Sequence, residues 1–199
     1  MTPMPHPPRA RLGLDTYSLR AQNWDAFQQL EYCAARGVTV VHFSEPRLVG
    51  GFDRAHLERV RARADALGLD IEIGMLSICP TSGIFDPSQG AAEDQLGRAI
   101  DAAVICGSPL VRCVLGNTFD RRTPGGIERH IEQVLHVLGR VRSRVIDAGV
   151  RIALENHSGD MQARELKMLV EAAGTDFVVI FLRVAKATPP IRCGLCHER

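Results

Sequence analysis

The sequence has few aromatic residues and no long apolar run. Phe, Trp and Tyr together make up 5% of the 199 residues, and 45% are hydrophobic in total. No segment approaches the ~18 apolar residues that a membrane-spanning helix needs, so we expect no membrane association. The first residues, MTPMPHPPRAR, are rich in proline and contain no apolar stretch of the secretory kind. These absences predict a cytoplasmic protein with a disordered arm over residues 1–10.

The chain also lacks an excess of charge of either sign. It has 24 basic and 23 acidic residues, which give a formal net charge of +1. Proteins that bind nucleic acid usually carry a clear basic excess, so we expect no nucleic-acid partner. The glycine motifs that bind nucleotide phosphates, G-x-G-x-x-G and the Walker sequence, are missing after the first predicted strand.

Cysteine is present, but over most of the chain its spacing matches no metal-binding or redox motif. Cys33, Cys79, Cys106 and Cys113 are scattered among apolar neighbours. Free cysteine behaves as a small hydrophobic residue and stays reduced in the cytosol. We therefore expect these four residues to be buried, reduced core residues.

What the chain does have is a regular alternation of β-rich and helical segments. The β-rich segments span residues 11–19, 38–45, 69–78, 109–116, 149–157 and 176–184. The helices between them are predicted to begin at Asn23, Asp53, near Ser88, at Thr123 and at Asp160, which are typical N-cap residue types. Six strands alternating with five helices predict βαβ units and a parallel sheet.

Polar residues stand at the carboxyl ends of several of these strands. They are Asp15, Tyr17, His42, Glu45, Ser77, Gly116, Asn117, Glu155 and His157. Active sites of (β/α)₈ barrels are built at this face, whereas an open doubly wound sheet would need a phosphate-binding glycine turn. The sequence therefore predicts an α/β fold of the TIM-barrel type, of which about six strands and five helices are present.

Alternation along the strands predicts which side chains face the barrel interior. In residues 151–157 the apolar even positions should pack on the helices, which turns Glu155 and His157 inward. In residues 109–116 the same reasoning turns Arg112 inward. His42 and Glu45 could line the same mouth, although a structural role is favoured for both.

The segment GVRIALENHSGD-MQARELKMLVEAAG, residues 149–174, resembles the xylose-isomerase-like barrel family of sugar and sugar-phosphate isomerases and epimerases. The stretches LGLDTYSL and LVRCVLG are similar to that family too, and the resemblance covers roughly residues 11–182. The strand end LENH is its most distinctive part. The family also includes dehydratases, hydrolases and abasic-site endonucleases, so the resemblance indicates the fold better than the substrate.

The resemblance implies a role for Glu155 as a ligand of a divalent metal and as a catalytic group that moves a proton. Isomerisation needs a proton taken from carbon next to a carbonyl or a hydride shifted between carbons, and in such a site a metal polarises the oxygens while a carboxylate shuttles the proton. Oxygen ligands suit Mn²⁺ or Mg²⁺, and an added imidazole suits Zn²⁺ or Co²⁺. The expected partner is a sugar, for which His157 and Arg112 are candidate binding residues. His157 could instead orient Glu155 or simply begin the loop.

The pattern of the family breaks after the fifth strand. If Leu182 aligns with the family leucine, the aspartate ligand expected next is replaced by Arg183. A barrel of eight units typically needs about 250 residues. We therefore expect a partial barrel over residues 11–183 and a non-family tail over residues 184–199, from a frameshift near residues 178–183 or a miscalled terminus. The metal site would then be incomplete and the activity absent or impaired.

Three alternatives remain open. One is an abasic-site endonuclease-like metalloenzyme of the same superfamily, against which the neutral charge argues. Another is a non-enzymatic haem, zinc or redox module that uses the CGLCH stretch from Cys193 to His197, which we expect to be a chance pattern. The last is an open barrel that completes itself as a homo-oligomer or does not fold stably.

Overall fold

The computed structural model describes residues 11–182, and the proposed arm and tail lie outside this range. Its centre is a six-stranded sheet in the order β1-β2-β3-β4-β5-β6, with every neighbouring pair parallel. The strands are β1 (Gly13–Asp15), β2 (Val40–Phe43), β3 (Asp70–Ser77), β4 (Leu110–Val114), β5 (Arg151–Glu155) and β6 (Val178–Phe181). This sequential parallel order confirms the βαβ units that the alternation predicts.

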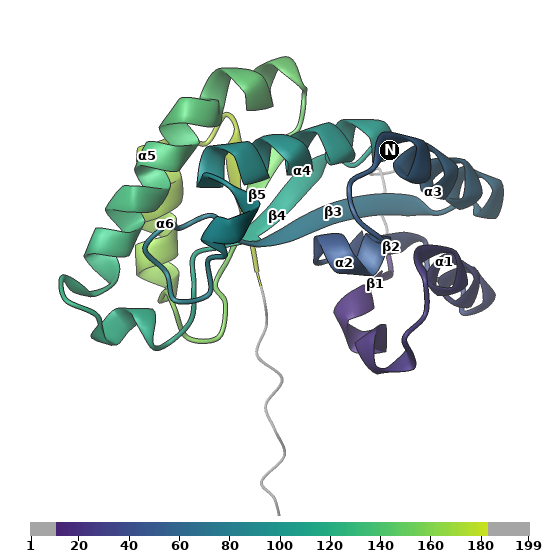
Figure 1. Cartoon of the computed structure of the whole chain (residues 1–199), viewed down its shortest axis with the longest axis horizontal. Helices are drawn as coiled ribbons and strands as arrows, with labels where there is room; N and C mark the ends of the chain where they lie inside the picture. The colour runs from purple at the N-terminus through teal and green to yellow at the C-terminus, as the bar shows by residue number, and fades with distance from the viewer. Residues whose placement is uncertain (1–10, 183–199) are drawn as a thin grey trace, which may run out of the picture.

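Helices connect the strands and cover one face of the sheet. The α-helices are α1 (Ala26–Ala35), α2 (Pro46–Val49), α3 (Arg54–Leu67), α4 (Ala92–Cys106), α5 (Gly126–Asp147) and α6 (Ala163–Ala173). Short 3₁₀ segments are η1 (Thr16–Gln22), η2 (Pro87–Gln89) and η3 (Asp120–Arg122). In Figure 1, α3, α4 and α5 follow one another along the outer face, and each packs on the next. The short helix α2 was not predicted.

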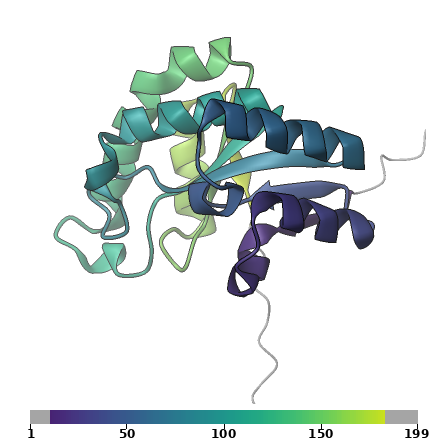
Figure 2. The same ribbon diagram turned by 45° about the vertical axis from the view of Figure 1, so that its right-hand side comes forward.

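The sheet is strongly twisted and curved (Figure 2). Its curvature is large enough for Phe181 on β6 to stack on His42 on β2 across the concave face. The six strands thus form part of a barrel whose inner face is lined by the inward residues. The fold class predicted from the sequence, an incomplete (β/α)₈ barrel, is confirmed for the described residues.

Only one of the five predicted helix starts is confirmed. The Asp53 side chain accepts a hydrogen bond from the backbone of His56 at the start of α3, as an N-cap residue should. The predicted cap at Asn23 is wrong, because Asp25 forms a reciprocal capping box with Gln28 and starts α1 instead. Asn23 adopts a left-handed conformation at the end of η1.

The other three starts lie a few residues later than predicted. The helix expected near Ser88 begins at Ala92, after η2. The helix expected after Thr123 begins at Gly126, because the Thr123 hydroxyl donates to the carbonyl of Asp120 and closes η3. The helix expected after Asp160 begins at Ala163, where Gln162 and Glu165 form the capping box. In each case the polar residue near the predicted start belongs to a local turn, and the helix begins after that turn.

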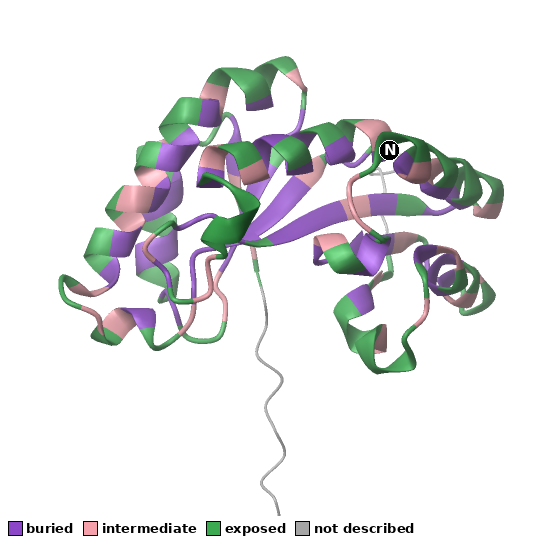
Figure 3. Cartoon of the chain, in the orientation of Figure 1, coloured by how far each residue is buried: buried purple, intermediate pink, exposed green. Residues whose placement is uncertain are grey.

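The hydrophobic core lies between the outer face of the sheet and the helices (Figure 3). It contains large, fully buried residues from alternate strand positions, such as Ile71, Ile73, Val111, Ile152 and Leu154. The four cysteines at positions 33, 79, 106 and 113 are all buried and free, as predicted. The concave face of the sheet is thereby left for the polar residues at the other strand positions.

Candidate functional site

Arg112 and Glu155 meet inside the barrel as a buried ion pair. Nε and Nη2 of Arg112 both lie 2.5 Å from Oε2 of Glu155. The two side chains are only 6% and 3% exposed, respectively. They come from adjacent strands, because β4 and β5 pair with Val114 opposite Glu155. Burying the carboxylate of Glu155 at a strand end would be costly without a partner, and Arg112 supplies that partner.

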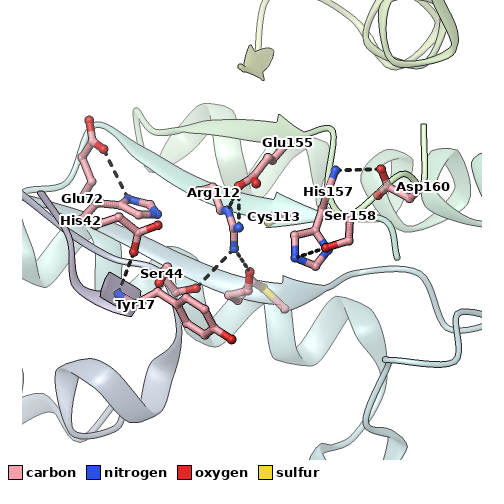
Figure 4. Close-up of polar contacts among 12 residues, drawn as sticks. Tyr17, His42, Ser44, Glu72, Arg112, Cys113, Glu155, His157, Ser158 and Asp160 are labelled. Atoms are coloured by element: carbon pink, nitrogen blue, oxygen red, sulfur yellow. Dashed lines mark hydrogen bonds and ion pairs between the residues drawn. The ribbon is translucent and has the colours of Figure 1, made fainter. Parts of the chain in front are cut away.

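The guanidinium of Arg112 is also held from the other side. Its Nη1 lies 3.3 Å from the carbonyl oxygen of Met75 and 3.5 Å from that of Ser44. The close packing of β2 and β3 depends on Gly74, the register partner of Arg112, because a Cβ there would lie 2.9 Å from Cα of Ser44. The guanidinium of Arg112 on β4 is therefore contacted from β3, from β5 and from the residue that follows β2 (Figure 4).

His157 follows β5 and lies at the mouth of the barrel. Its Nδ1 lies 2.8 Å from the carbonyl oxygen of Gly116, which can only accept, so Nδ1 carries the proton. In the neutral ring Nε2 is then an acceptor, 3.2 Å from the hydroxyl of Ser158. The loops that follow β4 and β5 thus fix both the orientation and the tautomer of this imidazole.

Asp160 ties these two loops together, although the sequence indicated only a helix cap at this position. It is fully buried and accepts hydrogen bonds from the backbone N–H groups of His157, Met161 and Gly116. Burial raises the pKa of the carboxyl to about 6 even though the three N–H groups lower it. Asp160, a buried carboxyl with a raised pKa, therefore holds the backbone N–H of His157.

A cavity of about 300 Å³ opens at the carboxyl ends of the strands. It is lined by Asp15, Tyr17, Ser44, Glu45, Leu76, Ile84, Arg112, His157 and Ser158. Arg112 and His157 thus face the same space, as the strand parity predicts. Glu155 is not among the lining residues, because the guanidinium of Arg112 lies against its carboxylate.

A second cavity of about 500 Å³ adjoins the first. Leu76 and Ile84 line both, and Phe52, Met75 and Pro46 contribute further apolar surface. Leu76 reaches this position at an irregularity in the pairing of β3 with β4 between Gly74 and Ser77. The mouth of the barrel therefore has a polar part and an apolar neighbour.

His42 does not line either cavity. Its Nδ1 lies 3.3 Å from Oε2 of Glu72, and neither ring nitrogen makes a hydrogen bond of good geometry. Phe181 stacks on the ring with the centroids 5.3 Å apart. His42 thus packs in the barrel interior, whereas Glu45 lines the mouth and pairs with Arg47 at 2.5 Å.

Another buried polar group shapes the loops after β3 and β4. Asp120 accepts hydrogen bonds from the Ser82 hydroxyl and from the backbone N–H groups of Gly83 and Asn117. Burial alone would raise the pKa of Asp120, but these hydrogen bonds lower it below its ordinary value. His130 is buried nearby and hydrogen-bonded to Thr81 and Thr123.

The described residues do not fit a metal centre. Between residues 11 and 182, no three His, Cys, Asp or Glu side chains are grouped so that they could hold a metal ion. Glu155, the predicted ligand, has the cation of Arg112 on its carboxylate. The proposed role of Glu155 as a metal ligand therefore remains a prediction from resemblance alone.

These features define a class of protein: a parallel β/α barrel with a polar, histidine- and arginine-lined site at the carboxyl ends of its strands. The sequence model of the family described as xylose isomerase-like TIM barrel matches residues 27–185. The chain belongs to this family. None of the helices within residues 11–182 combines the length and apolar character needed to cross a membrane.

Solved structures with the same fold include sugar epimerases. D-psicose 3-epimerase in the presence of D-fructose has a TM-score of 0.66 at 15% identity and covers 87% of this chain and 63% of its own. The 3-keto-D-glucoside 4-epimerase of E. coli gives 0.66 at 13% identity, with coverage of 87% and 68%. IolI with a bound zinc atom gives 0.67 at 13% identity, with coverage of 85% and 61%.

At these identities the likeness shows the fold alone. The chain spans 63% of the length of the D-psicose 3-epimerase chain. A comparison with curated proteins finds no match.

Proposed function

We propose that the barrel mouth binds a sugar or sugar phosphate and that the protein is of the isomerase and epimerase class. The observation that carries the proposal is the joint placement of Arg112 and His157 on one cavity of about 300 Å³. Cavities of this size accommodate small ligands. Tyr17, Ser158 and Asp15 add hydroxyl and carboxylate groups, which suit a ligand rich in hydroxyls.

The proposed chemistry uses His157, whose tautomer the hydrogen bonds define, and Arg112. Epimerisation or isomerisation next to a carbonyl needs a base that removes a proton from carbon. In the tautomer set by Gly116, Nε2 of His157 carries a lone pair that can accept from the Ser158 hydroxyl or take up a proton from a bound ligand. Arg112 offers a fixed cation to a carbonyl oxygen. The sugar epimerases among the similar structures support this class of reaction.

Turnover by the chain as given is expected to be low or absent. The resemblance assigns proton transfer to the carboxylate of Glu155. This carboxylate is already paired with Arg112 and does not line the cavity. The described residues supply no step that uses a divalent metal. We therefore expect binding to be easier to detect than catalysis.

Binding is the direct test. D-fructose, D-psicose and a phosphorylated ketose should be titrated into the protein by calorimetry, with His157→Ala as the variant and Lys167→Met on the exposed face of α6 as the control. The control should bind like the wild type, while His157→Ala should weaken binding about tenfold, the loss expected for one hydrogen bond. Absence of binding by all three sugars, or equal affinity in both variants, would overturn the proposal.

A further inference from the structure

The positive charge beside Glu155 is supplied by the chain itself. We propose that Arg112 takes the place of a divalent cation at this carboxylate, so that the barrel mouth presents a guanidinium to its ligand where the family resemblance leads one to expect a metal. This role of Arg112 at Glu155 does not depend on which sugar binds.

The first support is the geometry of the pair. Both Nε and Nη2 approach the same oxygen, Oε2, at 2.5 Å. Charge-assisted contacts of this kind are the strong ones, and arginine stays protonated in proteins. Glu155 therefore has a permanent cation at the position where a metal would need its lone pairs.

The second support is that the cation is held in place. Its Nη1 points to the carbonyl oxygens of Met75 and Ser44, and Gly74 lets β2 approach β3 beside it. Both side chains of the ion pair are almost completely buried. Moving the guanidinium aside for a metal would leave a buried cation with fewer partners, which is costly.

The third support is the donor set. A zinc ion bound to a carboxylate oxygen lies about 2.0–2.2 Å away and usually needs at least three protein ligands. The part of the chain that the structure describes offers no such group of three. A metal at Oε2 would also lie next to the positive charge of Arg112, and like charges at this distance repel strongly.

The consequence for the ligand is an arginine-based site. Arg112 lines the cavity while Glu155 does not. A carbonyl, carboxylate or phosphate oxygen entering the mouth would meet a planar donor, which prefers such oxygens. Binding should then be independent of divalent ions.

Direct metal titration of the wild type is the first experiment. Mn²⁺ is the probe, because it prefers oxygen ligands and binds weakly to cysteine sulfur, which the sequence also offers at Cys193 and Cys196. We expect the wild type and Glu155→Gln to show the same weak response in calorimetry and in thermal unfolding. Stoichiometric, micromolar binding that falls tenfold or more in Glu155→Gln would overturn the inference.

Removing the cation is the second experiment. Arg112→Met should lower the melting temperature. Added Mn²⁺ should raise the melting temperature of this variant more than that of the wild type. The double variant Arg112→Met/Glu155→Gln should melt higher than Arg112→Met and should not respond to Mn²⁺. If Arg112→Met does not fold, restored folding of the double variant still supports the inference. A double variant less stable than Arg112→Met would overturn it.

A third measurement separates this inference from the proposed function. Sugar binding should be unchanged, within twofold, after treatment with EDTA. Loss of sugar binding with EDTA would overturn the role of Arg112 and leave the sugar site standing. If no sugar binds but the two variant experiments succeed, the sugar site is wrong and the role of Arg112 stands.

Discussion

Phe181 on β6 stacks on the imidazole of His42 on β2, with the ring centroids 5.3 Å apart, although three strands lie between them in the sheet. A flat sheet would hold these strands far apart, since neighbouring strands are about 4.8 Å from each other. The contact therefore measures how far the six strands have curled toward a barrel. The same curvature brings Glu155 on β5 and the carbonyl groups of Met75 on β3 and Ser44, just after β2, around Arg112.

Loss of the buried Glu155 carboxylate inside the barrel should destabilise the protein strongly. Glu155→Ala leaves the cation of Arg112 buried without its partner, which costs about 3–5 kcal/mol. Urea denaturation followed by circular dichroism measures the change in the free energy of unfolding. The matched control is Glu171→Ala, where Glu171 is 54% exposed and pairs with Lys167 along α6. That change should cost about 0.5 kcal/mol or less, and equal losses in the two variants would contradict the buried ion pair.

The carboxyl of Asp160 should make stability fall as the pH rises from about 4 to 7. Its pKa is raised from the ordinary 3.8 to about 6 by burial, so the folded state binds the proton more tightly than the unfolded state. The stabilisation is complete below the unfolded pKa and is lost as the pH passes through the folded pKa. A difference of this size corresponds to roughly 3 kcal/mol.

The variant Asp160→Asn isolates this effect. An amide does not titrate, so its free energy of unfolding should lack the decline that the wild type shows over this pH range. Unfolding in urea at several pH values between 4 and 7 compares the two proteins. Parallel pH profiles would show that Asp160 is ionised normally in the folded state.

The contact between β2 and β3 should not tolerate a side chain at position 74. A Cβ there would lie 2.9 Å from both Cα and the carbonyl oxygen of Ser44, so Gly74→Ala should cost about 1–3 kcal/mol. Gly139→Ala in α5 meets nothing within 4 Å and should stabilise the helix by about 0.5–1 kcal/mol. Thermal unfolding of both variants provides the measurement, and opposite signs are expected. A neutral Gly74→Ala would show that the two strands are further apart.

The buried cysteines should resist alkylation in the native protein. Burial raises the pKa of Cys106 to about 11 and that of Cys113 to about 12, and the thiolate is the reactive form. Mass spectrometry after iodoacetamide treatment at pH 8 should show both residues unmodified in buffer and modified in urea. Rapid native labelling of Cys113 would contradict the packing of β4 against the helices.

The strands could be predicted with useful accuracy because their signal is local. Alternating β-branched and apolar residues placed β3 and β5 within two residues of their ends. Helix starts were predicted less well, because several polar residues near each start could serve as the N-cap. At Asn23, Thr123 and Asp160 the side chain or backbone serves a turn instead, and a capping residue further along begins the helix.

The candidate site, too, could be predicted only in part from the sequence. Face parity correctly turned Arg112 and Glu155 toward the interior, and it placed His157 at the mouth. It gave no sign that Asp160 holds the His157 loop or that Asp120 organises the neighbouring one. The same two carboxylates also contact Gly116 and Ser82, about 40 positions away in the chain, and no local pattern encodes these long-range contacts.

The sequence by itself determined the alternating β/α architecture, the family and the residues that face inward, because these follow from periodicity and short motifs. Only the tertiary structure decided what Glu155 contacts. Resemblance assigned it a metal, whereas the curled sheet places the guanidinium of Arg112 on its carboxylate. The physical reason is that a buried charge must be balanced by whatever the fold brings nearest, and in the described chain that neighbour comes from the adjacent strand.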